Sequence, residues 1–187
     1  MKNAVIFIAA TAIAGASGFA LQRYLATDMV AVTEIASMSE TASPVIGKMR
    51  PEFAMMDIEG NVRNIKDWDG QVVLLNFWAT WCPPCLEEIP GFIEIQQQLD
   101  NRGFQIIGVA VDNEENVREF ADEMAMNYPI LAGEMEAIEL SQKYGNSIGG
   151  LPFSAIIDKN GKVTHTIMGE LSKDRLISIL KQLGLAV

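Results

Sequence analysis

Apolar runs and helical apolar spacings alternate over most of the chain. Nearly continuous apolar stretches occur at 72–78, where only Asn76 is polar, and at 104–111. Such stretches are typical of strands buried on both faces. After each of them, apolar residues recur every three or four positions, which predicts two helices, the first stopped by Gly103 and the second capped by Asn113. We therefore expect 72–78 to be the central strand of a sheet.

Shorter elements surround this β-α-β-α core. Before it, 52–56 and 62–65 flank the turn sequence Glu59-Gly60-Asn61, which predicts a hairpin. The later elements are a short strand, a helix, a hairpin and a final helix, at 129–131, 136–144, 153–158 with 163–168, and 172–183. A parallel β-α-β unit and an antiparallel hairpin in one sheet predict the α/β class, with a mixed central sheet flanked by helices.

The chain begins with a separate apolar segment, residues 1–23. Its 18 residues from Ala4 to Leu21 carry no charge and lie between Lys2 and Arg23, in the order of a signal peptide or an uncleaved signal-anchor. Ala14-Gly15-Ala16 offers a weak cleavage site, but the apolar run continues beyond it, which favours a retained anchor. The positive-inside rule then places the body of the chain on the exported side of the membrane.

The rest of the chain divides into a tether and one domain. Residues 24–48 lack sustained periodicity and are rich in Ser, Thr, Ala and acidic residues, which predicts a flexible tether. Residues 49–187 are expected to form a single domain, because 187 residues leave no room for a second one of ordinary size. The net charge of −10, from 14 Lys and Arg against 24 Asp and Glu, argues against a nucleic-acid partner.

The candidate chemistry lies at Trp81-Cys82-Pro83-Pro84-Cys85, between the predicted central strand and its helix. Two cysteines and one histidine are too few for a structural zinc site or a framework of several disulfides, so the cysteines act as a pair. Two thiols in the first turn of a helix can form a disulfide, and the helix dipole favours a thiolate there. We expect Cys82 to be the exposed nucleophile and Cys85 to resolve the mixed disulfide. No cofactor is expected besides this redox-active pair.

The tract from Phe77 to Cys85 resembles the active site of thioredoxin-fold proteins. Within that superfamily it is similar to the membrane-tethered TlpA/ResA/DsbE group of thiol-disulfide oxidoreductases. Pro90 falls where this group kinks its active-site helix, and Gly150-Leu151-Pro152-Phe153 matches its cis-proline loop. The resemblance covers about Pro51 to the C-terminus and implies a thioredoxin fold with an N-terminal β-hairpin extension.

The resemblance also implies roles for residues around the two cysteines. Glu88 matches an active-site glutamate of the ResA-like proteins and would take the proton of Cys85, since Asn76 cannot accept one at neutral pH. The alternative interpretation of Glu88 is a solvated acid of the first helical turns, which we adopt for Glu87. The residues expected to contact the substrate are Trp81, Pro83, Pro84, Leu151 and Pro152.

Pro83 and Pro84 bear on the direction of the reaction. Neither has a backbone N–H, so two donors that would stabilise a Cys82 thiolate are missing. A less stable thiolate disfavours the dithiol form and makes it a better reductant. The sequence therefore favours a reductase.

Three functions agree with these features. The first is an exported reductase of protein disulfides, whose clients by resemblance include apocytochrome c and copper-site assembly factors, and whose electrons would come from a membrane thiol transporter of the DsbD or CcdA type. It would be a single-pass protein of the cytoplasmic membrane with its domain in the periplasm, or a soluble periplasmic protein after cleavage. The second is a peroxiredoxin-like peroxidase, although the Pro-x-x-x-Thr-x-x-Cys pattern is absent. The third is a Sco-like copper module with both cysteines and His165 as ligands, although we expect His165 to face solvent.

Overall fold

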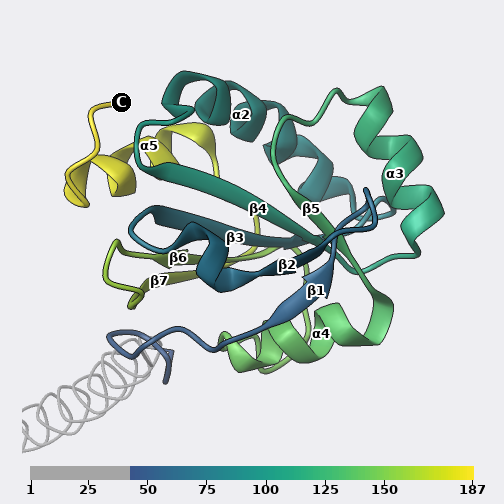
Figure 1. The fold of residues 1–187 in the computed structure, drawn as a ribbon, viewed down its shortest axis with the longest axis horizontal. Helices are drawn as coiled ribbons and strands as arrows, with labels where there is room; N and C mark the ends of the chain where they lie inside the picture. The colour runs from purple at the N-terminus through teal and green to yellow at the C-terminus, as the bar shows by residue number, and fades with distance from the viewer. Residues whose placement is uncertain (1–42) are drawn as a thin grey trace, which may run out of the picture. The chain divides into compact units, whose positions relative to one another are not determined.

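The computed structural model describes residues 43–187, so the predicted anchor and most of the predicted tether lie outside the described residues. Within the described part, no helix combines the length and the apolar character needed to span a membrane. The elements of Figure 1, in chain order, are β1 Ala54–Met56, β2 Val62–Asn64, the 3-10 helix η1 Ile65–Trp68, β3 Val72–Trp78, α2 Pro83–Leu99, β4 Phe104–Ala110, α3 Glu114–Glu123, β5 Ile130–Ala132, α4 Glu134–Lys143, β6 Phe153–Ile157, β7 Val163–Met168 and α5 Lys173–Gln182.

A five-stranded mixed sheet has the order β5-β4-β3-β6-β7. β3 runs parallel to β4, and β4 to β5, whereas β6 is antiparallel to both β3 and β7. All seven residues of β3 are buried, which matches their almost entirely apolar sequence. The predicted mixed sheet with 72–78 at its centre is therefore confirmed.

Successive side chains of β3 enter two different cores, because a strand points them alternately to its two faces. Leu74 and Trp78 join the core formed with α2, α3 and α5, whereas Leu75 and Phe77 join the core formed with α4 and η1. Figure 1 shows α2 and α5 on one side of the sheet and α4 on the other. Asn76 lies on the same face of β3 as Leu74 and Trp78, the face covered by α2, and is the only polar residue that β3 places there.

Local signals determine where the helices begin. The Asn113 side chain accepts a hydrogen bond from Asn116 N at 3.0 Å and caps α3, as its sequence predicts. α4 begins two residues earlier than the apolar spacing indicates, directly after Gly133. After α2, Gly103 adopts a φ of +79°, a left-handed conformation that glycine reaches without steric cost and that turns the chain into β4.

The segment before β3 lies against the sheet edges. β1 and β2 pair antiparallel with Met55 opposite Arg63, and Ile65 belongs to η1, where Asn64 caps the first turn. The last residues of the segment assigned to the tether run beside β7: Gly47 N donates to Val163 O at 2.8 Å, and Val163 N donates to Lys48 O at 3.0 Å.

We predict that Val73→Ala lowers the free energy of unfolding by about 2 kcal/mol, because it removes two buried methyl groups and leaves a cavity in the centre of the sheet. Val73 is 3% exposed in β3. The matched control is Val62→Ala in β2, where the valine is 69% exposed and the change should stay within about 0.5 kcal/mol. Urea denaturation of both variants measures the difference, and equal losses would contradict the prediction.

Candidate active site

Cys82 and Cys85 form a disulfide at the start of α2, beyond the carboxyl end of β3, with their Cα atoms 5.3 Å apart. Cys82 is the N-cap of the helix, and its carbonyl accepts hydrogen bonds from Cys85 N at 3.0 Å and Leu86 N at 3.3 Å. The pairing follows from local geometry, since residues three apart in a first helical turn lie close together. The predicted redox pair is therefore present in its oxidised form.

The two cysteines are less accessible than we expected. Cys82 is 5% exposed and Cys85 is fully buried, both within the core on the α2 face of the sheet. The expectation of an exposed Cys82 is thus wrong for the disulfide form, because tertiary packing covers the end of the helix. Cys82 nevertheless remains the more accessible of the pair, and the neighbouring Trp81 is 65% exposed.

Three prolines shape α2. Pro83 and Pro84 occupy its first two positions, and no hydrogen bond from the helix reaches the Cys82 side chain. Both prolines are exposed beside the disulfide. Pro90 lies inside the helix, where it cannot donate to the carbonyl of Leu86, four residues earlier. Of the first two helical positions, neither can therefore donate a backbone hydrogen bond to Cys82 Sγ.

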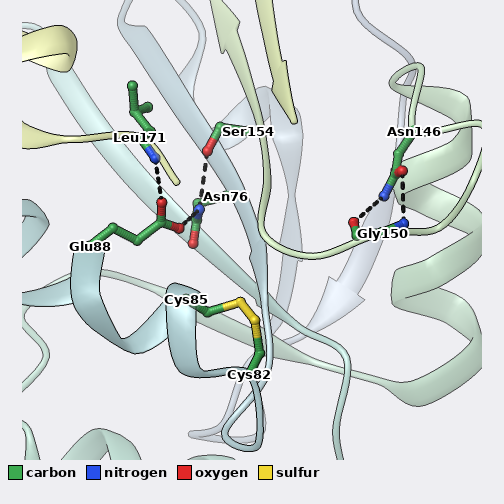
Figure 2. Close-up of a disulfide and its surroundings, with 8 residues drawn as sticks. All are labelled: Asn76, Cys82, Cys85, Glu88, Asn146, Gly150, Ser154 and Leu171. Carbon is green, nitrogen blue, oxygen red and sulfur yellow. Dashed lines mark hydrogen bonds between the residues drawn. A yellow bond between two sulfur atoms is a disulfide. The ribbon is translucent and has the colours of Figure 1, made fainter. Parts of the chain in front are cut away.

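Glu88 is buried close to the redox pair, one helical turn beyond Cys85. Its side chain is 3% exposed. Oε1 accepts a hydrogen bond from Asn76 Nδ2 at 2.6 Å, and Oε2 accepts one from Leu171 N at 2.8 Å, as Figure 2 shows. The interpretation of Glu88 as a solvated acid is therefore wrong, whereas the adjacent Glu87 is exposed as expected.

The environment of Glu88 adapts it to proton exchange near neutrality. Burial raises the pKa of Glu88 from 4.5 to about 7. The hydrogen bonds from Leu171 and Asn76 favour the ionised form and limit the rise in this pKa, while the charge of Glu170 adds to it. A carboxyl group with this pKa can both take up and release a proton at neutral pH.

The Leu151–Pro152 peptide bond is cis, as predicted. Pro152 is buried and Leu151 is half-buried. The loop before this bond is held by a side chain that our sequence analysis missed: Asn146 Nδ2 donates to Gly150 O at 2.9 Å, and Gly150 N donates to Asn146 Oδ1 at 3.2 Å (Figure 2). The only available signal was an asparagine three residues before the pair Gly149-Gly150, in a stretch of residue types that are common in turns.

His165 lies on β7, the edge strand of the sheet. It is half-buried rather than solvent-facing, and burial, helped by the charge of Arg175, lowers its pKa. Within residues 43–187, no three His, Cys, Asp or Glu side chains come together in a way that could hold a metal ion. The ligand set of the Sco-like alternative, both cysteines with His165, is therefore not assembled in the described structure.

Comparison with known proteins agrees with this geometry. A model of the Redoxin family matches residues 46–183. The chain belongs to the Redoxin family. It is 38% identical over 143 residues to the thiol-disulfide oxidoreductase ResA of Bacillus thuringiensis, covering 74% of this chain and 78% of the relative. ResA of Geobacillus thermodenitrificans is 34% identical over 137 residues, covering 73% and 76%.

Two solved structures share the fold of this chain. The crystal structure of a thioredoxin-family thiol:disulfide interchange protein from Chlorobium tepidum matches with a TM-score of 0.66 and 31% identity, over 72% of this chain and 94% of the other. A putative thiol:disulfide interchange protein DsbE from the same organism matches with a TM-score of 0.63 and 28% identity, over 74% and 94%. This Redoxin family member is thus a thioredoxin-like oxidoreductase of the TlpA/ResA/DsbE group, as its sequence indicates.

The raised pKa of Glu88 predicts a pH-dependent stability. Below pH 4.5 the group is neutral in both the folded and unfolded states. Between pH 4.5 and about 7 it ionises only in the unfolded state, so native stability falls as pH rises. Since glutamine cannot ionise, the free energy of unfolding of Glu88→Gln should rise relative to the native protein by about 3 kcal/mol across this window.

Denaturant titrations at several pH values check this prediction. Glu87→Gln is the matched control, because Glu87 is the adjacent residue and is exposed. Its stability should follow that of the native protein at every pH. A constant difference between Glu88→Gln and the native protein from pH 4 to pH 8 would contradict the raised pKa.

Proposed function

We propose that this oxidoreductase reduces disulfide bonds in exported protein clients through Cys82 and Cys85. The observation that carries the proposal is a cysteine pair at a helix start, followed one turn later by a buried carboxyl group, Glu88, whose pKa burial raises to about 7. Thiol-disulfide exchange needs a nucleophilic thiolate, a second thiol to release the client, and a group to take up the proton of that thiol.

The reaction transfers two electrons and two protons to the client. The Cys82 thiolate attacks one sulfur of the client disulfide, so that a mixed disulfide forms and the first client thiolate leaves and is protonated. Cys85 then gives its proton to Glu88, and its thiolate attacks Cys82 Sγ. The Cys82–Cys85 disulfide forms, and the second client thiolate leaves and takes up a proton.

The helix start supports the reducing direction. Cys82 Sγ receives no capping hydrogen bond, and the proline at each of the next two positions has no N–H to donate. The thiolate gains less from the helix start than it would beside free N–H groups, which favours the disulfide over the dithiol form of this protein. A dithiol that readily becomes a disulfide is a reductant.

The surroundings of the disulfide suit a protein client. Trp81 is exposed beside the pair, as are Pro83 and Pro84. The loop at Leu151 and Pro152 would offer the Leu151 backbone to an extended client segment, as β-augmentation does. The client that we propose is apocytochrome c or the copper-site cysteines of an oxidase assembly factor, as the resemblance to the TlpA/ResA/DsbE group implies.

The compartment and the electron donor complete the proposal. The uncharged run from Ala4 to Leu21 supports a signal-anchor in the cytoplasmic membrane with the domain in the periplasm, or a soluble periplasmic form after cleavage. A reductase in that oxidising compartment needs electrons from the cytoplasm. A membrane thiol transporter of the DsbD or CcdA type would supply them.

The reduction potential of the Cys82–Cys85 couple tests the direction. In the full chain, equilibrated with glutathione and dithiothreitol buffers, we expect a value nearer the roughly −270 mV of thioredoxin than the roughly −120 mV of DsbA. Pro84→Ala restores the N–H of the second helical position, which can donate to Cys82 Sγ, and should make the potential less negative. Pro83→Ala, at the first position, should change it less. A native value near that of DsbA would make this protein a disulfide donor instead.

The division of labour between the cysteines predicts a trapping result. Cys85→Ser should accumulate a mixed disulfide between Cys82 and a client protein, because nothing remains to resolve it. Cys82→Ser should trap none, since Cys85 is fully buried. Non-reducing electrophoresis followed by mass spectrometry identifies the adducts and the client. Equal trapping by both variants would show that Cys82 is not the attacking residue.

A further inference from the structure

A chain of three buried polar side chains lies on the α2 face of the sheet beside the redox pair. Asn76, Glu88 and Ser154 are 1%, 3% and 0% exposed. Asn76 in β3 is directly opposite Ser154 in the neighbouring strand β6. Burying an amide or hydroxyl group costs free energy unless it is hydrogen-bonded, and an apolar side chain would suit this core better. These polar residues therefore call for an explanation beyond packing.

Hydrogen bonds hold the Asn76 amide in one orientation. Its Nδ2 donates to Glu88 Oε1 at 2.6 Å and to Ser154 Oγ at 3.1 Å, which uses both N–H bonds of the amide group. The nitrogen, rather than the carbonyl oxygen, thereby faces the carboxyl group (Figure 2).

Glu88 receives one donor on each of its two oxygens. The Leu171 N–H donates to Oε2 and the Asn76 amide to Oε1. In the described part of the chain, Asn76 is the only side chain that donates to Glu88. The backbone donor cannot be removed by changing the Leu171 side chain, so Asn76 is the donor that a substitution can remove.

We propose that Asn76 and Ser154 are positioning residues, which hold the Glu88 carboxylate in place to accept the proton of Cys85. Ser154 fixes the Asn76 amide, and Asn76 fixes Glu88 Oε1. This inference rests on the proposed function, because it concerns the step in which Cys85 resolves the mixed disulfide. It extends the site from the helix that carries both cysteines to the two central strands β3 and β6.

The charges around Glu88 make the Asn76 donor important. The titratable groups near it are Cys85 on its own helix, Glu170 beside Leu171, and Tyr128 ahead of β5. Burial raises the pKa of Tyr128, which stays neutral at pH 7, and Glu170 opposes ionisation of Glu88. Without the Asn76 donor, burial and the charge of Glu170 both raise the pKa of Glu88, and only the hydrogen bond from Leu171 N lowers it. The pKa of Glu88 would then rise further, so that a smaller fraction of Glu88 would be ionised at neutral pH and ready to take the Cys85 proton.

The experiment follows the resolution step alone. The reduced full chain is mixed with an aromatic disulfide, 5,5′-dithiobis(2-nitrobenzoate), and thiolate release is followed by absorbance from pH 5 to pH 9. The first release reports attack by Cys82 and the second reports resolution by Cys85. In Asn76→Leu, the second release should slow about tenfold at pH 7 and recover at higher pH. The reason is that the loss of a hydrogen bond to the charged carboxylate raises the pKa of Glu88.

Two further variants sharpen this test. Ser154→Ala should slow the second release in the same pH-dependent way, but by a smaller factor. Gln96→Leu is the control for loss of a buried amide on α2: Gln96 is 4% exposed and accepts from Ile106 N at 2.7 Å, away from Glu88. The rate of the second release in Gln96→Leu, divided by the same rate in the native protein, should be constant with pH.

The outcomes separate the two proposals. A native pH profile in Asn76→Leu, or a slowdown equal at all pH values, overturns the positioning role while leaving the reductase intact. Absence of any second release in the native protein overturns the proposed function itself.

A measurement on the native chain decides the question if Asn76→Leu does not fold. The side-chain amide resonances of Asn76 should shift with a midpoint near pH 7 and cease to shift in Glu88→Gln. Amide resonances that do not respond to pH in the native protein overturn the positioning role.

Discussion

The burial of β3 on both faces is the constraint on which the site depends. Seven residues, all of them buried, place this strand between two helical layers and at the centre of the sheet. β3 ends at Trp78 and α2 begins at Pro83, so the start of the helix, which carries Cys82 and Cys85, lies just beyond the end of this buried strand. The redox pair is thus positioned by the buried central strand and the helix that follows it.

The same burial explains the proton chemistry. α2 lies over the face of β3 that carries Asn76, so a glutamate one turn beyond Cys85 is forced into an apolar core. Burial disfavours the charge of Glu88, and the two donors restore part of its stability, so its pKa comes to about 7. Neither effect alone produces a group that exchanges protons at neutral pH. The pKa of Glu88 depends on both effects together.

The proposed function assigns the two tasks of a thiol-disulfide oxidoreductase to different parts of the structure. Electron transfer is local to the first turn of α2, where sulfur atoms three residues apart meet. Client contact would fall to Trp81 and to the loop at Pro152, which Asn146 holds through Gly150. Variation in the client surface can therefore leave the redox pair and its proton acceptor unchanged, which is consistent with thioredoxin-like folds that serve many partners.

The sequence by itself determined the strands, the helices and the redox pair, because these depend on residues close together in the chain. Apolar runs predicted β3 and β4, and the spacing of Cys82 and Cys85 predicted their disulfide. Only the tertiary structure decided that Cys82 is covered and that Glu88 meets Asn76 and Leu171, which are 12 and 83 positions away. The Asn76 contact with Ser154 spans 78 positions. Burial and hydrogen bonding across such separations arise when whole elements pack, and no local pattern encodes them.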